Sequence, residues 1–101
     1  MKPAIFSSIA REEFLDAIRR IAENNPVAAK ALKDDARQVA RTLGNHPLLG
    51  CTRPDLASPP VRFYFMTGFP YVIVYDPELE PPVVLRFLHE ARHLPEILRD
   101  L

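Results

Sequence analysis

Apolar residues recur at helical spacing through the first half of the chain. After Ser8 they fall three or four residues apart, at Phe14, Leu15, Ile18, Ile21 and Ala22, with charged residues between them. This period predicts an amphipathic helix that runs to Asn24. Ser7 or Ser8 stands where a side chain caps the start of a helix. The preceding residues, 3–7, are short and apolar and predict a strand.

A second amphipathic helix is predicted from Pro26 to about Leu43. Asn25 stands at the N-cap position, and Pro26 suits the first helical position because no amide donor is needed there. Its inner face is predicted to carry Ala28, Ala31, Leu32, Ala36, Val39 and Leu43. Gly44 follows, where a residue in the left-handed conformation commonly ends a helix. The two helices predict an antiparallel hairpin.

The period changes after residue 60. The segments VRFYFM (61–66), YVIVY (71–75) and VVLRFL (83–88) are rich in β-branched and aromatic residues, and TGFP and DPELEPP separate them. They predict a three-stranded antiparallel meander. The predicted fold class is therefore α+β: an N-terminal strand and an α-helical hairpin packed on a three- to four-stranded antiparallel sheet, with a short C-terminal helix or tail.

Both faces of this sheet are predicted to be apolar. Val72 and Val74 point to one face, and Tyr71, Ile73 and Tyr75 to the other; likewise Val83, Leu85 and Phe87 oppose Val84, Arg86 and Leu88. A single hairpin covers one face only. The other face needs the loop of residues 45–60, the tail after Leu94, or a second protein. We expect Leu48, Leu49 and Leu56 of the loop to pack against the body, and an uncovered apolar face would be a binding surface.

Composition places the chain among ordinary globular proteins. It has 101 residues, of which 48% are hydrophobic and 26% charged, so one domain with its own core is expected over residues 1–101. Thirteen basic residues balance thirteen acidic ones, which gives no overall support for direct nucleic-acid binding. The single cysteine, Cys51, fits a reducing cytoplasm, and no apolar run is long enough for a signal peptide or a membrane span.

One short motif suggests catalysis. His89 to His93 read H-E-x-x-H, in which two histidines on one helix face bind zinc. Here the motif begins at the end of a predicted strand, and Pro95 prevents a long helix from continuing through it. Cys51 with His46 is an equally thin case for a nucleophilic pair. The sequence therefore predicts no metal and no cofactor, and the two histidines are interpreted as surface or interface residues.

A set of ordered segments nevertheless resembles a known family. FSSIAREEFLDAI, NPVAAKAL, HPLLG, GFPYVIVY and VLRFLHEAR-LP follow one another from Phe6 to Leu98. Their order and spacing resemble the ParE branch of the RelE/ParE toxins. The resemblance implies the toxin of a bacterial type II toxin–antitoxin pair, with a cognate antitoxin as partner. Toxins of the ParE branch inhibit DNA gyrase by binding and catalyse nothing themselves.

The RelE branch cuts messenger RNA on the ribosome, and the resemblance allows its catalytic positions to be compared. That branch uses two lysines on the first meander strand, an arginine on the next, and a late arginine and tyrosine. Here the lysine positions fall near Phe63 and Phe65, or at Arg62 and Tyr64 if the turn differs by one residue. Val72 and Leu98 occupy two others, and only Arg92 matches. Gyrase inhibition is therefore the expected activity, with a ribosome-dependent endonuclease or an inactive antitoxin-binding relative as the alternatives.

The candidate partner- and target-binding residues are arginines and aromatic residues of the meander. Arginine and tyrosine are favoured interface anchors because they combine large contact area with directional hydrogen bonds. The set is Arg62, Tyr64, Tyr71, Tyr75, Arg86, His89 and Arg92. Arg92 is the strongest member. The antitoxin is expected to lay an amphipathic segment across the hairpin and the exposed sheet face.

Overall fold

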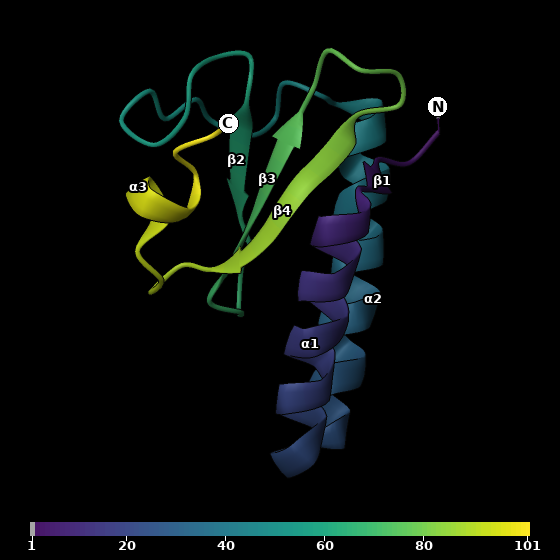
Figure 1. The fold of residues 1–101 in the computed structure, drawn as a ribbon. Coiled ribbons are helices and arrows are strands. Elements are labelled where there is room, and N and C mark those ends of the chain that lie inside the picture. The colour runs from purple at the N-terminus through teal and green to yellow at the C-terminus, as the bar shows by residue number, and fades with distance from the viewer. Residues whose placement is uncertain (1) are drawn as a thin grey trace.

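The computed structural model describes residues 2–101 and confirms the predicted α+β fold. Its elements are β1 (Ile5–Phe6), α1 (Ser8–Asn24), α2 (Pro26–Asn45), β2 (Arg62–Phe65), β3 (Tyr71–Asp76), β4 (Val83–His89) and α3 (Leu94–Ile97). The four strands form one sheet in the order β1-β4-β3-β2, with the helical hairpin on one side (Figure 1). β2, β3 and β4 form the antiparallel meander, whereas β1 lies parallel to β4.

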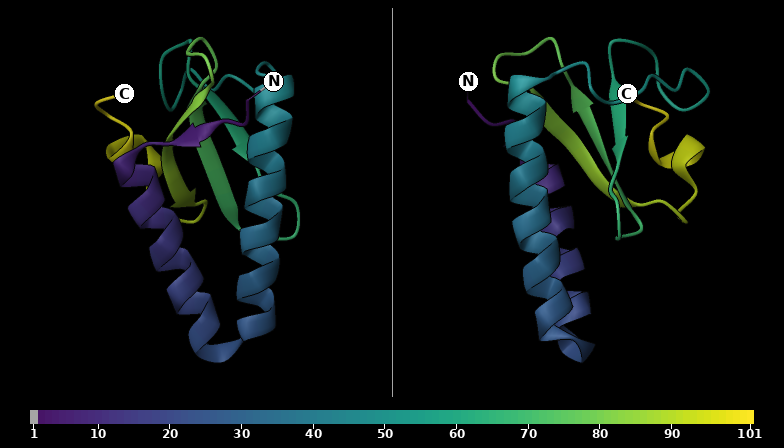
Figure 2. Two further views of the ribbon diagram at one scale, coloured as in Figure 1. Left: turned by 90° about the vertical axis from the view of Figure 1, so that its right-hand side faces the viewer. Right: turned by 180° about the vertical axis from the view of Figure 1, so that it is seen from behind.

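The predicted helix starts are confirmed by their capping bonds. The Ser7 hydroxyl accepts a hydrogen bond from the Ala10 amide, and the Asn25 side chain accepts one from the Ala28 amide. Pro26 occupies the first turn of α2, where its missing donor costs nothing. The two helices meet at their connecting turn and diverge towards the end where β1 crosses between them (Figure 2).

The prediction that Gly44 ends the second helix in a left-handed conformation is wrong. α2 continues through Gly44 to Asn45, and among residues 2–101 only Gly68 has a positive φ, of 84°. The glycine is needed for a different reason: a Cβ atom there would overlap the carbonyl oxygen of Lys2. The inner face of α2 is also rotated slightly, so that Ala29 and Ala40 are buried and Ala31 is exposed.

A β-bulge changes the face assignment in β4. The pairing register shifts between Val74 and Tyr75, so that Val74 lies opposite Arg86 while Tyr75 lies opposite Val84. Leu85 is the extra residue, and strict alternation fails there. Val84 and Phe87 consequently lie on the face of the sheet that the helical hairpin covers, which we call the hairpin face, and Leu85 and Leu88 lie on the opposite face. The predicted grouping of Val83, Leu85 and Phe87 on one face is therefore wrong.

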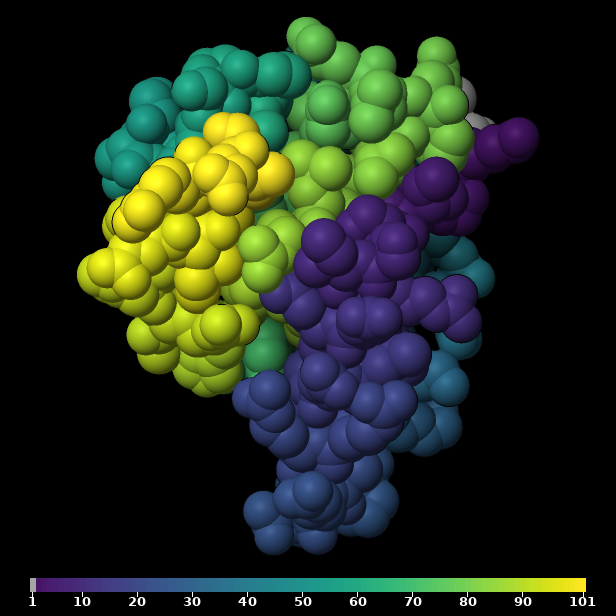
Figure 3. Space-filling model, viewed as in Figure 1, coloured from purple at the N-terminus to yellow at the C-terminus, as the bar shows by residue number. Residues whose placement is uncertain are grey.

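Both faces of the sheet are covered by the chain itself. On the hairpin face, Tyr71, Ile73 and Tyr75 pack against α1 and α2. On the opposite face, which we call the loop–tail face, Val72 and Val74 pack against residues contributed by the loop and by the C-terminal segment, namely Ala57, Val61, Leu94 and Leu98. Figure 3 shows the C-terminal segment against the loop on this side of the molecule. The expected uncovered sheet face is therefore absent from residues 2–101.

The covering loop uses different leucines from those predicted. Leu56 packs against the loop–tail core, but Leu48 and Leu49 remain 68% and 51% exposed. The reason is local: the Cys51 backbone pairs with Phe63 of β2, and the Gly50 amide donates to the Tyr75 hydroxyl. These bonds hold this part of the loop against the sheet and leave the two preceding side chains outside. Among the helices of residues 2–101, none has the length and apolar character that crossing a bilayer requires.

Candidate functional site: a cationic groove between the diverging helices

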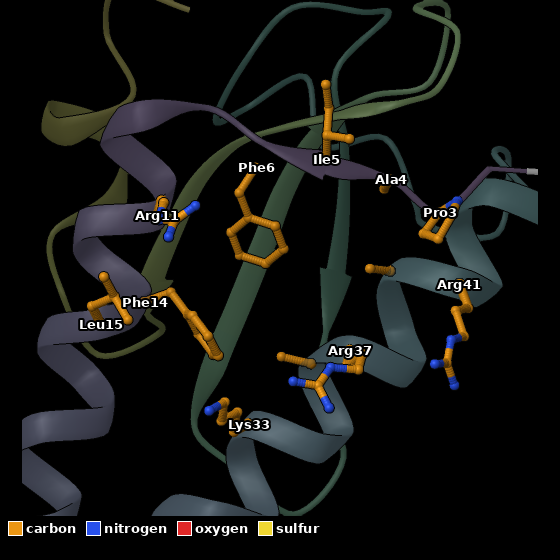
Figure 4. Close-up of a pocket in the computed structure, with 12 residues that line it drawn as sticks. Pro3, Ala4, Ile5, Phe6, Arg11, Phe14, Leu15, Lys33, Arg37 and Arg41 are labelled. Carbon is orange, nitrogen blue, oxygen red and sulfur yellow. The ribbon is translucent and has the colours of Figure 1, made fainter.

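A hollow of about 750 Å³ lies where α1 and α2 diverge, and β1 crosses one end of it. Its lining residues are Pro3, Ala4, Ile5, Phe6, Arg11, Phe14, Leu15, Lys33, Ala36, Arg37, Ala40 and Arg41. Figure 4 shows the rings of Phe6 and Phe14 directed into this space between the two helices. We call this hollow the hairpin groove.

The groove exists because small residues face large ones across the hairpin. Ala36 and Ala40 of α2 are too short to fill the widening gap to α1. The floor is built instead from aromatic rings: the centroid of Phe14 lies 5.5 Å from that of Phe6 and 5.2 Å from that of Phe87. These separations are typical of attractive aromatic pairs. The floor is therefore a packed apolar surface that stays open to solvent above.

The walls of the groove carry one sign of charge. Arg11 stands on α1, and Lys33, Arg37 and Arg41 follow one another along α2 at intervals of four residues. No acidic residue lines the groove. Within residues 2–101 none of these four cations forms an ion pair. A chain of zero net charge thus concentrates unpaired positive charge around one apolar hollow.

The strand beside the groove, β1, has few backbone groups that are free to form hydrogen bonds with another chain. β1 has two residues, and the amides of Ile5 and Ser7 already donate to β4, at Pro82 O and Val84 O. The Ala4 amide donates to Ala40 O of α2 at 2.8 Å. Because alternate amides of a strand point to opposite edges, Phe6 has the one amide that faces away from β4 within this strand.

The edge of β4 beyond β1 is closed by the side chains of Ser7, which caps α1, and of Glu13 in α1. The Ser7 hydroxyl donates to Leu85 O at 3.1 Å, and one Glu13 carboxylate oxygen accepts from the Phe87 amide at 3.1 Å. Glu13 also forms a bidentate ion pair with Arg86, with N–O distances of 3.0 and 2.7 Å. The Arg86 side chain is 22% exposed and the Glu13 side chain 17%. The pairing raises the pKa of the Arg86 guanidinium. The candidate residue Arg86 therefore helps to hold α1 against β4.

Two other candidates hold the loop in place. The Tyr75 hydroxyl is fully buried; it donates to Pro47 O at 2.7 Å and accepts from the Gly50 amide at 2.8 Å. Burial raises the pKa of this phenol. Arg62 donates to Leu48 O and Gly50 O, the second at 2.7 Å. The structure thus gives Tyr75 and Arg62 positions that anchor the loop to the sheet.

The remaining candidates gather at the opposite end of the meander. Tyr71 stacks on Phe87 with ring centroids 5.0 Å apart, and its edge meets His89 at 5.3 Å. His89 and the exposed Arg92 line a small hollow of about 90 Å³ that α1 closes from the other side. Tyr64 packs half-buried against the hairpin-face core. Of the predicted set, the structure brings together Tyr71, His89 and Arg92.

The histidine motif does not form a metal-binding helix. His89 ends β4, a turn follows, and His93 precedes the four-residue α3. The Nδ1 atom of His89 accepts a hydrogen bond from the Ala91 amide at 3.0 Å, while His93 contacts Glu96. Within residues 2–101 no three His, Cys, Asp or Glu side chains are grouped as metal ligands would be.

The groove residues were not among the predicted site residues. A signal was present, because Lys33, Arg37 and Arg41 flank Ala36 and Ala40 on one helix and put cations beside a face that lacks bulk. That α1 diverges from this helix and leaves a hollow beside the alanines depends on the tertiary structure. Periodicity alone assigns these alanines to a filled core.

The fold and the groove define a small α+β module with an open helical surface, and comparison with known proteins gives its family. The family profile described as "ParE toxin of type II toxin-antitoxin system, parDE" matches residues 4–94. The chain therefore belongs to the family of ParE toxins of type II toxin–antitoxin systems, as the resemblance implied. Such a system pairs the toxin with an antitoxin.

A solved structure shares this fold. A chain of the chromosomal ParDE TA system from P. aeruginosa superimposes with a TM-score of 0.71 at 19% identity, covering 88% of this chain and 96% of that chain. No curated protein matches this sequence.

Proposed function

We propose that this protein is a toxin that acts by binding DNA gyrase and that a cognate antitoxin neutralises it through the hairpin groove. Membership of the ParE family is the observation that carries the proposal. The groove supplies the structural support, because it combines an apolar floor with an open top on a chain whose sheet faces are both covered. Grooves of this kind between helices commonly receive an amphipathic helix of a partner.

The side chains at the positions where the nuclease branch carries its catalytic residues support a binding function rather than catalysis. By resemblance, Val72 and Leu98 stand where that branch carries an arginine and a tyrosine. Both lie in the loop–tail core, with 0% and 1% of their surface exposed. Phosphodiester cleavage needs cations or polar groups that stabilise charge on the phosphate. Buried apolar side chains contribute none.

The surface proposed to contact the target is the end of β4 with the turn after it. Arg92 is exposed there, and its backbone is fixed by a bond from its amide to His89 O at 3.0 Å. Arginine at a rigid, exposed position is a favoured binding anchor. This surface does not overlap the hairpin groove, so the proposal separates target contact from neutralisation.

Induced expression in a bacterial host, with DNA and protein synthesis pulse-labelled in parallel, tests the proposed target. A gyrase inhibitor stops DNA synthesis first. Earlier arrest of protein synthesis, with codon-phased transcript ends, would favour the ribosome-dependent endonuclease. Unimpaired growth at full expression would identify an inactive antitoxin-binding relative.

The Arg92→Ala variant tests the contact residue. Arg92 is exposed and its side chain forms no hydrogen bond or ion pair within residues 2–101, so the variant should keep its thermal stability and lose toxicity. Arg99→Ala is the matched control, since it removes an exposed arginine farther along the tail. Full toxicity of Arg92→Ala would remove this residue from the proposed contact surface.

A further inference from the structure

We infer that the small hollow between α1 and the turn after β4 receives a single carboxylate group presented by the target protein. The inference rests on the proposed function, because it adds a site and a chemistry to the contact surface around Arg92. Three observations carry it: the size of the hollow, its unpaired donors, and the acidic residues around it. We call it the arginine hollow; its lining residues are Glu13, Asp16, Ala17, Arg20, Tyr71, Phe87, His89 and Arg92.

The arginine hollow has room for one small group. Its volume is about 90 Å³, roughly that of three water molecules in the liquid. Ala17 is the smallest of the lining residues and leaves space beside the rings of Tyr71 and Phe87, whose centroids lie 5.0 Å apart. Figure 3 shows the surface hollowed between α1 and the turn after β4. A carboxylate group fits this volume, whereas a helical segment does not.

Two arginines from distant parts of the chain face this space without partners. Arg20 stands on α1, and Arg92 stands in the turn after β4. Both are exposed, and within residues 2–101 neither forms an ion pair. A guanidinium group is a favoured partner of a carboxylate because its N–H groups match the two carboxylate oxygens. The two arginines therefore form a cationic pair that lacks its anion.

The two acids of the lining do not supply that anion. The Glu13 carboxylate accepts from the Arg86 guanidinium and from the Phe87 amide. Asp16 is paired with Arg19 at 2.7 Å. Each acid is thus occupied by a group other than Arg20 or Arg92, and the hollow keeps an excess of positive charge.

Uncharged donors complete the arginine hollow. Tyr71 is 9% exposed, and among the tyrosines of residues 2–101 only Tyr75 has a hydrogen-bonded hydroxyl. Because no fully buried side-chain nitrogen or oxygen in this range lacks a partner, the Tyr71 hydroxyl reaches the surface, and the surface that Tyr71 lines is this hollow. The Nδ1 atom of His89 accepts from the Ala91 amide, so the neutral ring keeps its proton on Nε2 as a donor. An anion would accept from groups that the free chain leaves to water.

The surroundings of the hollow favour one carboxylate over the phosphates of a nucleic acid. A nucleic-acid strand carries a phosphate at every nucleotide, so its binding surface needs a row of cations. Beside the hollow, α1 carries Glu12, Glu13 and Asp16, and the turn carries Glu90. These acids would repel the phosphates on either side of a bound one. An aspartate or glutamate side chain of a protein brings one negative charge to the two arginines and none to the acids around them.

The site is tested directly with acetate as the probe. The side-chain Nε–H signals of Arg20, Arg92 and Arg99 of the full-length chain are followed by NMR, with sodium chloride at equal ionic strength as the reference. We expect the first two signals to shift together with one dissociation constant, and that of Arg99, which lies outside the hollow, to stay unchanged. Arg20→Ala should abolish the shift of Arg92. Tyr71→Phe, which keeps the stacked ring, should weaken acetate binding about threefold or more.

Several results of this titration would overturn the inference. They are independent shifts of Arg20 and Arg92, an equal response of Arg99, and an undiminished shift of Arg92 in Arg20→Ala. Dimethyl phosphate, a monoanion like acetate, mimics the nucleic-acid backbone. If it bound about tenfold more tightly than acetate, the site would be a phosphate site and the carboxylate assignment would be wrong.

The use of the hollow by the target is tested by expression of the Arg20 variants. Arg20→Ala should lose toxicity as Arg92→Ala does, whereas Arg20→Lys should retain part of it because the positive charge remains. Arg99→Ala is again the control. A wild-type chain that binds acetate but does not arrest DNA synthesis would refute the proposed function and keep the carboxylate site. A wild-type chain that arrests DNA synthesis, together with full toxicity of Arg20→Ala, would overturn the inference and leave the proposed function standing.

Discussion

The two faces of the sheet are both apolar, but they are covered in different ways. The hairpin face is covered by two long helices that diverge and leave a groove, whereas the loop–tail face is covered by irregular chain that fits closely over it. On the loop–tail face Phe63, Val72 and Leu98 are almost completely buried. On the hairpin side Ile5, Leu15 and Phe14 keep part of their surface exposed.

This difference shows that the two diverging helices leave a groove on their side of the sheet. Two rigid helices cannot bend to fill the space between them. The small side chains of Ala36 and Ala40 leave this space wider than larger residues would. A loop of many prolines follows the contour of the strands and closes over them. The loop–tail face is therefore closed over its apolar side chains, whereas the hairpin side keeps an open groove.

The largest expected effect is the loss of a buried aromatic side chain from the loop–tail face. Phe63→Ala should lower the free energy of unfolding by about 3–5 kcal/mol because it removes a fully buried ring and leaves a cavity. Phe14→Ala, in the groove, should cost about 1–2 kcal/mol because this ring is only partly buried. Urea denaturation measures both. Equal losses would show that the groove floor is as tightly packed as the loop–tail core.

A smaller effect is expected at the ion pair that joins the hairpin to β4. Glu13→Ala should cost about 2–3 kcal/mol, because it leaves the Arg86 guanidinium and the Phe87 amide without their acceptor. Asp16→Ala, one turn away, breaks an exposed pair with Arg19 and should cost less than about 0.5 kcal/mol. The comparison uses thermal unfolding at pH 7. Similar costs would mean that Glu13 is solvated rather than structural.

The smallest expected effect concerns the buried phenol that fixes the loop. Tyr75→Phe should cost about 1–2 kcal/mol, since the Gly50 amide and Pro47 carbonyl lose their partner. Tyr64→Phe, whose hydroxyl has no hydrogen bond within residues 2–101, should be nearly neutral.

The pH dependence of Tyr75→Phe gives this prediction a second measurement. Burial raises the pKa of Tyr75 above its ordinary value of 10.0, so the native state holds this proton more tightly than the unfolded state does. The resulting stability is fully present below pH 10 and is lost as the pH rises above it. The stability difference between the wild type and Tyr75→Phe should therefore narrow above pH 10. A constant difference would contradict a buried Tyr75 hydroxyl.

Most of the fold could be predicted because its local signals agree with its tertiary structure. Ser7, Asn25 and Pro26 mark the helix starts by chemistry that acts over three or four residues, and the alternation in YVIVY gives the faces of β3 correctly. The errors have tertiary causes. The bulge at Leu85 depends on pairing with β3, and the reason for Gly44 is the approach of Lys2, more than forty residues earlier.

The candidate site could be predicted only in part for the same reason. Residue type identified Arg86 and Tyr75 as candidate anchors, but their contacts with Glu13 and Pro47, 73 and 28 residues away, could not be predicted from a local pattern. The groove depends on how far two helices diverge, which no local pattern encodes. The cations that line the groove can be seen in the sequence, but the hollow that they surround cannot.

The closed edge of β4 has a consequence for the behaviour of the protein in a crowded cell. A strand with free amides and carbonyls is a template on which further copies can add and grow into aggregates. Ser7 and Glu13 occupy those groups beyond the point where β1 ends. The edge of β4 beyond β1 therefore offers few free backbone groups on which a strand of another chain could add.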